Sequence, residues 1–582
     1  MSTVRVVAAI DFGTYATGFA WAYKRRDRPL VPEAIQLYDS WPGAAVPYHK
    51  NLTALLLDEV GEVADWGYRA HNRHMQERDS QNTYHVRFKM GLLRESALAA
   101  RTGSRPDRPT SGAQTFGTQT PGAQTPGYPP EFLVTQYLKA FCKHALAEVL
   151  TRSKVRADEI LWCLTVPAIW RDQERRLMRA CAEQAGLPGS PERLLIAVEP
   201  EVAALYARQA GEAKLNEPGS RFMVVDAGGG TVDLTAYEVA PAGLTEIGLS
   251  TGGKHGATYS DAYLVDRILA DRIGPEVLST IVKNSPELLH KVSAQWELAK
   301  RTFDPEQTYP VVLDISSPML KAISAADGAR SRLAKAQGGV DDQFVLTPKE
   351  VKQAFDHTIH PLLELVREQL KTVGPKSVSQ ILLVGGFAQS RYLQEQLRKA
   401  FDSRRMQVVV PTTPAAAILL GAVFYANDPT LIRGRTTKLT YGISFAEPFE
   451  RGIDPASTLI VQYDGQELCS ARFKAFVRAG EVVEPGTRVP VQAFPILAGQ
   501  RSMGLKVVVT EEKTPRYVTD EGCRELGMIE IDMSKTLDLP PAERMIEINM
   551  IFGGTEVETV ARDPRTGEEE RLFIDFVEED RP

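Results

Sequence analysis

The chain has 582 residues, a formal net charge of −6 and five cysteines. This length exceeds what one hydrophobic core supports and predicts about three or four domains. The slightly acidic balance disfavours nucleic acid and anionic membranes as partners, and no apolar run approaches the length of a membrane-spanning helix. The cysteines form no CxxC pair and the first apolar run leaves no room for a cleaved signal, so we expect buried thiols and a cytoplasmic location.

The first feature along the chain is a predicted β-hairpin. Residues 4–10 are apolar, residues 11–14 read Asp-Phe-Gly-Thr, and the apolar pattern resumes over residues 18–22. The order is a strand, an acid, a turn of glycine and threonine, and a second strand. This order returns later in the chain.

The composition changes over residues 101–130, where Thr, Gly, Pro, Gln and Ser dominate. Such a segment cannot fill a core and predicts a flexible surface insertion, with a docking or modification site as the alternative. Helical periodicity resumes over residues 132–150. A buried strand over residues 160–166 and a helix over residues 171–185 are expected next.

The central motif spans residues 222–238. An apolar run ends at Asp226, three glycines and Thr231 follow, and Asp233 begins a second β-prone run. Glycines have no Cβ atom, so their backbone N–H groups can converge on an anion, and the threonine adds a hydroxyl donor. The two carboxylates can hold the waters of a hydrated magnesium ion. Taken alone, the three glycines favour a glycine-rich hairpin turn without a ligand.

A third turn follows the strand predicted over residues 381–384. There Gly385 and Gly386 lead into a helical pattern over residues 391–401, and close backbone approach at the glycines suits a flat nucleoside. In order, the three turns predict a duplicated α/β fold that holds the phosphate chain of a nucleotide between two lobes.

One helix upstream of the third turn carries a charged face. Glu297, Lys300 and Arg301 share that face by their i, i+3 and i+4 spacing. A solvated salt-bridge face is the alternative to a ligand site there.

The last part of the chain differs in character. Residues 429–438 form a polar linker, and short alternating apolar runs with Pro and Gly punctuation follow over residues 439–582. This spacing predicts a β-sandwich.

These motifs resemble the actin-like ATPase superfamily and, more narrowly, the DnaK-type heat-shock proteins of seventy kilodaltons. The two hairpins resemble the phosphate loops of the family, and the turn at Gly385 resembles its adenosine turn. Residues 198–206 look like the segment that connects the lobes, and residues 297–302 look like the adenosine-clamping helix. The wording Phe-Lys-Met at residues 88–90 is similar to the divergent type-twelve branch.

The resemblance implies an α/β fold class. A two-lobed actin-like (ribonuclease H-like) ATPase domain is expected over residues 1–428, with a clamp subdomain over about 255–345. After the linker at 429–438, a mainly β, substrate-binding-like domain without a helical lid is expected over 439–582.

The resemblance also implies ATP or ADP with Mg²⁺ as cofactors. Asp11 and Asp226 would hold the metal through water, and Glu199 with Asp233 would position the attacking water. Lys89 is the candidate for the lysine that reaches the γ-phosphate, although a gapless match places the neighbouring phenylalanine there. The other implied nucleotide contacts are Gly13, Thr14, Tyr15, Gly228, Gly229, Gly230, Thr231, Gly253, Glu297, Lys300, Arg301, Gly385, Gly386, Phe387 and Gln389.

The chain departs from the family pattern at the nucleoside end and in the linker. Phe387, Ala388 and Gln389 replace a Ser-Thr-Arg triplet, and Ala415 replaces an aspartate, so nucleotide affinity or base preference is expected to differ. A polar linker has little apolar surface to dock, which puts the usual coupling between nucleotide and β-domain in doubt.

The function implied is that of an ATP-hydrolysing, DnaK-like molecular chaperone. A peptide or protein client, a co-chaperone and a nucleotide-exchange factor are the expected partners. The alternatives are a nucleotide-dependent switch or scaffold with little ATPase activity, a β-domain that binds one specific partner, and, with less support, a small-molecule kinase.

Overall fold

The computed structural model describes residues 3–25, 29–76, 81–92, 127–170, 172–190, 192–211, 217–241, 243–374, 378–552 and 557–573. The predicted insertion at 101–130 lies outside the described residues except for 127–130. The chain divides into two compact units. The first consists of Met1–Val239 and Ser250–Pro429, and the second of Ala240–Leu249 and Thr430–Pro582.

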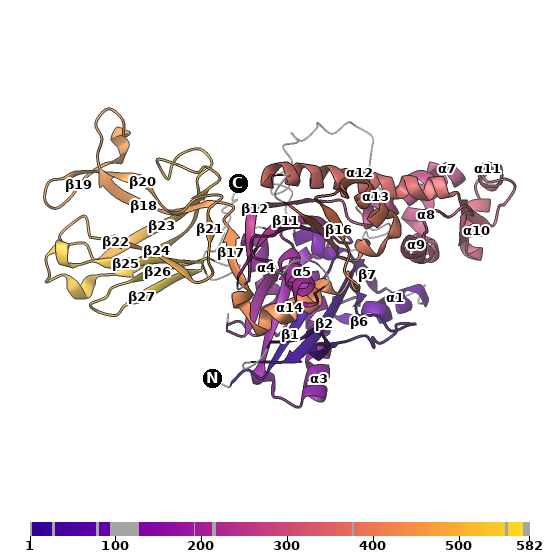
Figure 1. The fold of residues 1–582 in the computed structure, drawn as a ribbon, viewed down its shortest axis with the longest axis horizontal. Coiled ribbons are helices and arrows are strands. Elements are labelled where there is room, and N and C mark those ends of the chain that lie inside the picture. Colours follow the sequence, from indigo (N-terminus) through magenta and orange to yellow (C-terminus); the bar gives the residue numbers. More distant parts are fainter. Residues whose placement is uncertain are drawn as a thin grey trace. The chain divides into compact units, whose positions relative to one another are not determined.

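The first sheet of the first unit contains the N-terminal hairpin, β1 (Val6–Phe12) with β2 (Ala16–Tyr23) (Figure 1). Two parallel strands, β8 (Ile160–Val166) and β9 (Leu194–Val198), extend it beside β1. The order is β3-β2-β1-β8-β9, where β3 is Gln36–Leu37. Every residue of β1 and β8 is buried, as expected for strands covered on both faces.

The second sheet repeats this arrangement with the central motif. Strands β10 (Arg221–Ala227) and β11 (Val232–Ala240) form the hairpin. Strands β15 (Gln380–Val384) and β16 (Gln407–Val409) continue it in parallel beside β10. The two predicted hairpins are therefore both present, each joined to two parallel strands.

Helices surround these sheets. Five of them are α1 (Gly67–Gln76), α3 (Pro130–Ser153), α4 (Asp172–Gln184), α5 (Glu199–Gln209) and α14 (Ala417–Asn427). A small antiparallel sheet contains β5 (Ala54–Leu57), β6 (Val63–Trp66) and β7 (Thr83–Val86). Helices α5 and α14 cross closely at Gly421. A Cβ atom there would lie 1.7 Å from the carbonyl oxygen of Val202, so only glycine allows this approach. This contact fixes the helix that begins with Glu199.

The predicted clamp region is mainly helical. It contains α6 (Thr258–Tyr263), α7 (Ala270–Ile273), α8 (Pro275–Asn284), α9 (His290–Thr302), α10 (Ser317–Ser324), α11 (Ala329–Ala336) and the strand pair β13 (Val311–Asp314) with β14 (Gln343–Leu346). Helix α12 (Pro348–Val373) follows, with a capping box at Thr347 and Glu350, and α13 (Arg391–Phe401) comes after β15. Trp296, Phe303 and Phe355 are fully buried and join these helices to one core.

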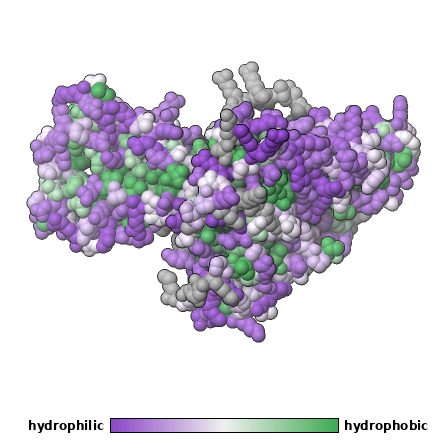
Figure 2. Space-filling view, viewed as in Figure 1, coloured by the Kyte–Doolittle hydropathy of each residue, from purple (hydrophilic) through white to green (hydrophobic). Residues whose placement is uncertain are grey.

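The second unit is built from two antiparallel sheets. One has the order β19-β20-β18-β23-β24 and the other the order β22-β25-β26-β27. The strands are β18 (Thr440–Pro448), β19 (Leu459–Val461), β20 (Glu467–Val477), β22 (Thr487–Ala493), β23 (Ser502–Thr510), β24 (Arg524–Asp532), β25 (Ile546–Phe552), β26 (Val557–Arg562) and β27 (Glu569–Phe573). Apolar residues of both sheets share one core, and Figure 2 shows apolar side chains gathered in this part of the unit. The arrangement is a β-sandwich.

The polar linker contains a strand, β17 (Ile432–Thr436). It pairs in parallel with β12 (Gly243–Gly253) at residues of the second unit, and in antiparallel with β21 (Val482–Val483). The amide of Thr436 also donates to the Glu246 carboxylate at 3.1 Å. Backbone pairing and hydrogen bonds of Thr436 therefore hold β17, a strand without leucine side chains.

Candidate functional site

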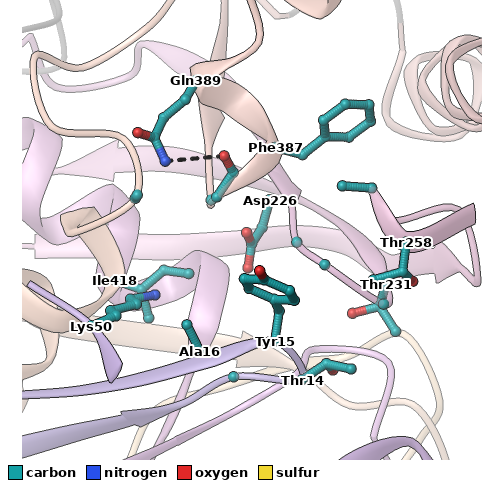
Figure 3. Close-up of a pocket in the computed structure, with 18 of the residues that line it drawn as sticks. Thr14, Tyr15, Ala16, Lys50, Asp226, Thr231, Thr258, Phe387, Gln389 and Ile418 are labelled. Carbon is teal, nitrogen blue, oxygen red and sulfur yellow. Dashed lines mark hydrogen bonds between the residues drawn. The ribbon is translucent and has the colours of Figure 1, made fainter. Parts of the chain in front are cut away.

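One pocket of the first unit brings together all of the predicted site residues except Asp233 and Gly253 (Figure 3). Ala415, which takes the place of an aspartate of the family pattern, also lines it. The other lining residues are ones that no sequence motif indicated: Ala16, Tyr48, Lys50, Ala257, Thr258, Ser390 and Ile418. The three predicted turns, which are far apart in the sequence, meet at this pocket.

The glycine turn of the central hairpin (residues 228–231, the phosphate turn) has its carbonyl groups turned away from the pocket. The amides of Gly256, Ala257 and Thr258 donate to the carbonyl oxygens of Gly230, Gly228 and Gly229, at 3.3, 3.1 and 2.9 Å. In a trans peptide the N–H points opposite to the C=O. The amides of Gly229, Gly230 and Thr231 therefore point away from the supporting loop.

Two of these amides are available to a ligand. The N–H groups of Gly229 and Gly230 have no acceptor among the residues that the structure describes. A Cβ on Gly229 would lie 3.0 Å from the Tyr15 side chain, and one on Gly230 would lie 2.7 Å from the Met90 sulfur. The first hairpin has a similar feature, since Thr53 Oγ1 donates to the Gly13 carbonyl at 2.7 Å and so orients the next amide, that of Thr14. Such converging amides form an anion site.

Glu199 begins helix α5 and is buried at the pocket. Its carboxylate accepts a hydrogen bond from Lys89 Nζ at 2.8 Å. Burial raises the pKa of Glu199 to about 7, with Asp11 and Asp233 acting in the same direction and the Lys89 ammonium opposing them. Glu199 therefore titrates near neutral pH, where a general base works best.

Lys89 lies in the pocket, while its neighbour Phe88 packs in the core against Phe12 and Tyr137. Besides Glu199, the Lys89 ammonium donates to the carbonyl oxygen of Phe12 at 2.5 Å. Its side chain is 4% exposed. The candidate lysine thus faces the pocket, and the residue that a gapless match selected does not.

The two aspartates predicted to hold magnesium have different surroundings. Asp11 Oδ2 accepts from Lys50 Nζ at 2.6 Å, and Asp11 Oδ1 accepts from Thr165 Oγ1 at 2.9 Å. Asp226 Oδ1 is buried and has no hydrogen-bond partner in the described part of the chain. Burial, with Glu199 as the next cause, raises the pKa of Asp226 well above its usual range.

The surroundings of Asp226 fit a hydrated cation. A buried carboxylate oxygen without a donor is the group that the waters of a bound Mg²⁺ would satisfy. Within the described ranges, no group of three His, Cys, Asp or Glu residues could hold a metal directly. An ion at this place would therefore keep most of its waters.

The predicted clamp face is an ion-pair cluster at the pocket wall. Lys300 Nζ lies 2.6 Å from Asp261 and 2.7 Å from Glu297, and Arg301 lies 3.0 Å from Glu297. The Arg301 guanidinium also lies over the Tyr48 ring, 5.2 Å from its centroid. The face is not a solvated one, because Lys300 is buried.

The altered adenosine turn has one side chain in the core and one at the pocket. Phe387 is buried and stacks on Phe355, with ring centroids 6.2 Å apart, so it does not replace a base-stacking side chain. Gln389 Nε2 donates to the Tyr48 hydroxyl and to the Gly386 carbonyl, both at 3.2 Å. Tyr48 therefore borders the nucleoside end, which no motif in the sequence indicated.

Two predicted site residues lie outside the pocket lining. Asp233 accepts from the amide of Ile169 at 2.8 Å and stands opposite Asp226 in the hairpin. Gly253 is buried against His255, since a Cβ there would lie 2.7 Å from that ring. Gly256, three residues later, makes the contact with the phosphate turn instead. None of the helices described is long and apolar enough to cross a bilayer.

The site therefore combines a turn of free amides, buried carboxylates and ammonium groups, in an α/β unit that precedes a β-sandwich. The known proteins with similar sequences include heat-shock proteins and a DnaK chaperone. Over 98% of its length the chain is 28% identical to heat shock 70 kDa protein 12B of Homo sapiens and 26% identical to heat shock 70 kDa protein 12A of Homo sapiens, covering 91% of each. Chaperone protein DnaK 3 of a Synechococcus strain is 27% identical over 51% of the chain and 40% of that protein.

The resemblance to the seventy-kilodalton heat-shock family, and within it to the type-twelve branch, is thereby confirmed. Homology to this family implies an actin-like ATPase domain followed by a β-domain, and both units of the structure are consistent with it. Residues 216–410 also match a family described as "Domain of unknown function (DUF8340)".

Proposed function

We propose that the chain binds Mg-ATP in this pocket and hydrolyses it to ADP and phosphate, and that the nucleotide state alters ligand binding by the β-domain. The observation that carries the proposal is the phosphate turn, whose amides at Gly229 and Gly230 have no acceptor in the described structure and adjoin the partnerless oxygen of Asp226. Amides and a free carboxylate side by side suit a phosphate chain with its hydrated cation.

Different residues of the pocket have different roles in hydrolysis. The amides and hydroxyls of Thr14 and the phosphate turn orient the phosphate chain, and Asp226 holds the waters of the metal. Lys89 provides a positive charge beside Glu199, and ionised Glu199 orients the attacking water and accepts its proton. Magnesium, when bound, neutralises charge on the phosphate oxygens. No covalent enzyme intermediate is required.

Equilibrium binding of ATP combined with a single-turnover assay tests the proposal. Conversion of bound ATP to ADP and phosphate supports it. Tight binding without conversion supports the alternative of a nucleotide-dependent switch, which the Lys89 to Glu199 ion pair favours, because a paired carboxylate is held away from water. Transfer of the phosphate to a metabolite would reveal a kinase.

The rate of hydrolysis should rise with pH. Because the pKa of Glu199 is raised to about 7, its ionised fraction, and with it the rate, should increase about tenfold from pH 6 to pH 8. Lys89→Met removes the ammonium that lowers this pKa, so its profile should shift to higher pH. Single-turnover rates at saturating Mg-ATP measure both profiles. A flat wild-type profile would contradict the assignment of Glu199 as the base.

The β-domain has apolar side chains exposed on two connected segments. Val461 ends strand β19 and Tyr463 lies in the turn after it, whereas Phe494 and Leu497 lie on the loop after β22; their exposed fractions are 54, 42, 42 and 58%. The amide of Tyr463 donates to the carbonyl of Ile496 at 2.9 Å, which joins the two segments. Exposed apolar groups beside strand edges suit an extended apolar peptide.

An unfolded, apolar polypeptide should therefore bind the β-domain and stimulate ATP hydrolysis several-fold. Val461→Asp should weaken both effects, because a charge would be buried against the peptide. Steady-state hydrolysis with and without reduced, unfolded protein measures this. Binding of the same polypeptide by wild type and Val461→Asp with equal affinity would place the ligand elsewhere.

A further inference from the structure

Besides Lys89 and Lys300, the pocket contains a further buried lysine, Lys50, to which the proposed function assigns no role. Lys50 directly precedes the short strand β4 (Asn51–Leu52), and its side chain packs over Gly18 of β2, where a Cβ would lie 3.0 Å from Lys50 Cγ. Figure 3 shows it beside Ile418, on the opposite side of Asp226 from Thr231. Three ammonium groups thus line the pocket, and that of Lys300 already lies between Asp261 and Glu297.

The contacts of Lys50 leave it able to bind more than one acceptor. Its ammonium has three N–H donors, and among the described residues it meets one acceptor, Asp11 Oδ2 at 2.6 Å. The other oxygen of the Asp11 carboxylate, Oδ1, accepts from Thr165 Oγ1, so both oxygens of Asp11 have a donor within the protein. Asp11 is therefore already neutralised by a protein cation, whereas Asp226 is not.

The charge balance of the pocket requires cations for a phosphate chain. The pocket is lined by the acids Asp11, Glu199, Asp226 and Glu297 and by the cations Lys50, Lys89, Lys300 and Arg301. Of these cations, Lys50 pairs with Asp11 and Lys89 with Glu199. A polyphosphate adds several negative charges in a buried place, where unpaired charge is costly. Lys50 raises the local positive charge near Asp226, whose pKa it lowers against the larger effect of burial.

We propose that Lys50 binds the phosphate chain directly and supplies, on the Asp11 side of the pocket, positive charge that would otherwise come from a metal ion. The inference rests on the proposed function of ATP binding. It predicts that ATP binds measurably without Mg²⁺, and that the divalent ion acts mainly through Asp226.

Calorimetric titration of the full chain with ATP, in Mg²⁺ and in EDTA, tests this. For the wild type, the Kd in EDTA should stay within about tenfold of the Kd in Mg²⁺. Lys50→Met should raise the Kd in EDTA by a further ten- to hundredfold, since a charge-assisted hydrogen bond to phosphate is lost, and raise the Kd in Mg²⁺ less. Lys139→Met, at an exposed position of α3, should change neither value.

A second variant guards against loss of folding. Lys50→Met leaves the Asp11 carboxylate buried without its cation, so the double variant Asp11→Asn with Lys50→Met, which removes both charges, should fold and show the same loss in EDTA. Binding by the wild type in Mg²⁺ but not in EDTA, or equal EDTA affinities of wild type and both variants, would overturn the role of Lys50 and leave the proposed function standing. No ATP binding by the wild type in either condition would overturn both.

Discussion

Replacing Gly256 with valine is expected to lower ATP affinity by at least about a hundredfold. Even a Cβ atom there would lie 2.4 Å from the carbonyl oxygen of Gly229 and 2.6 Å from the amide nitrogen of Gly230. These are backbone atoms, so the overlap can be relieved only by moving the phosphate turn, at a cost of about 1–3 kcal/mol or more. The amides that we assign to the phosphate chain would then lose their alignment.

Calorimetric titration with Mg-ATP measures this effect. Gly499→Val is the matched control, because a Cβ at Gly499 meets no atom within 4 Å and its backbone does not need a positive φ. The control should bind ATP as the wild type does. Unfolding midpoints of both variants should be recorded, since Gly256→Val also strains its own loop. Wild-type affinity in folded Gly256→Val would contradict the assignment of the phosphate turn.

Replacing Glu199 with glutamine should lower the single-turnover rate by about 10²–10⁴-fold while changing the affinity for Mg-ATP by less than about threefold. Glutamine has nearly the same shape and can still accept from Lys89, but it cannot take a proton from water. A general base contributes to the transition state and little to ground-state binding, so rate and affinity should separate.

The control for this substitution is Glu183→Gln, which changes an exposed carboxylate of α4 in the same way. Its rate and affinity should equal those of the wild type. An unchanged rate in Glu199→Gln would assign the activation of water to another group, of which Asp233 is the candidate because it is the other residue predicted to position the water. A parallel loss of affinity would indicate a structural role for Glu199.

The parts of the site that the sequence predicts are those that depend on local chemistry. An acid followed by glycines and threonine between two apolar runs specifies a hairpin with exposed amides, because only glycine tolerates that close approach. Helical spacing likewise placed Glu297, Lys300 and Arg301 on one face, and they meet at the pocket wall. The alternating runs after residue 439 predicted the sandwich for the same reason.

The parts that the sequence did not predict depend on contacts between distant segments. Lys50 sits in a stretch with no periodicity and reaches Asp11 across 39 residues of chain. The hydrogen bonds that support the phosphate turn come from the amides of Gly256 to Thr258, and sequence spacing does not show which carbonyl groups these amides meet. Phe387, at the position where the adenosine turn departs from the family pattern, packs into the apolar core that contains the clamp helices.

Single-turnover hydrolysis by the wild type and by Asp226→Ala, with ATP binding measured alongside, tests the central claim most directly. We expect the wild type to convert bound Mg-ATP to ADP and phosphate. Asp226→Ala should bind ATP but hydrolyse it at least about a hundredfold more slowly, because no carboxylate then accepts hydrogen bonds from the waters of the metal ion. Absence of ATP binding by the wild type, or an unchanged rate in Asp226→Ala, would contradict the central claim.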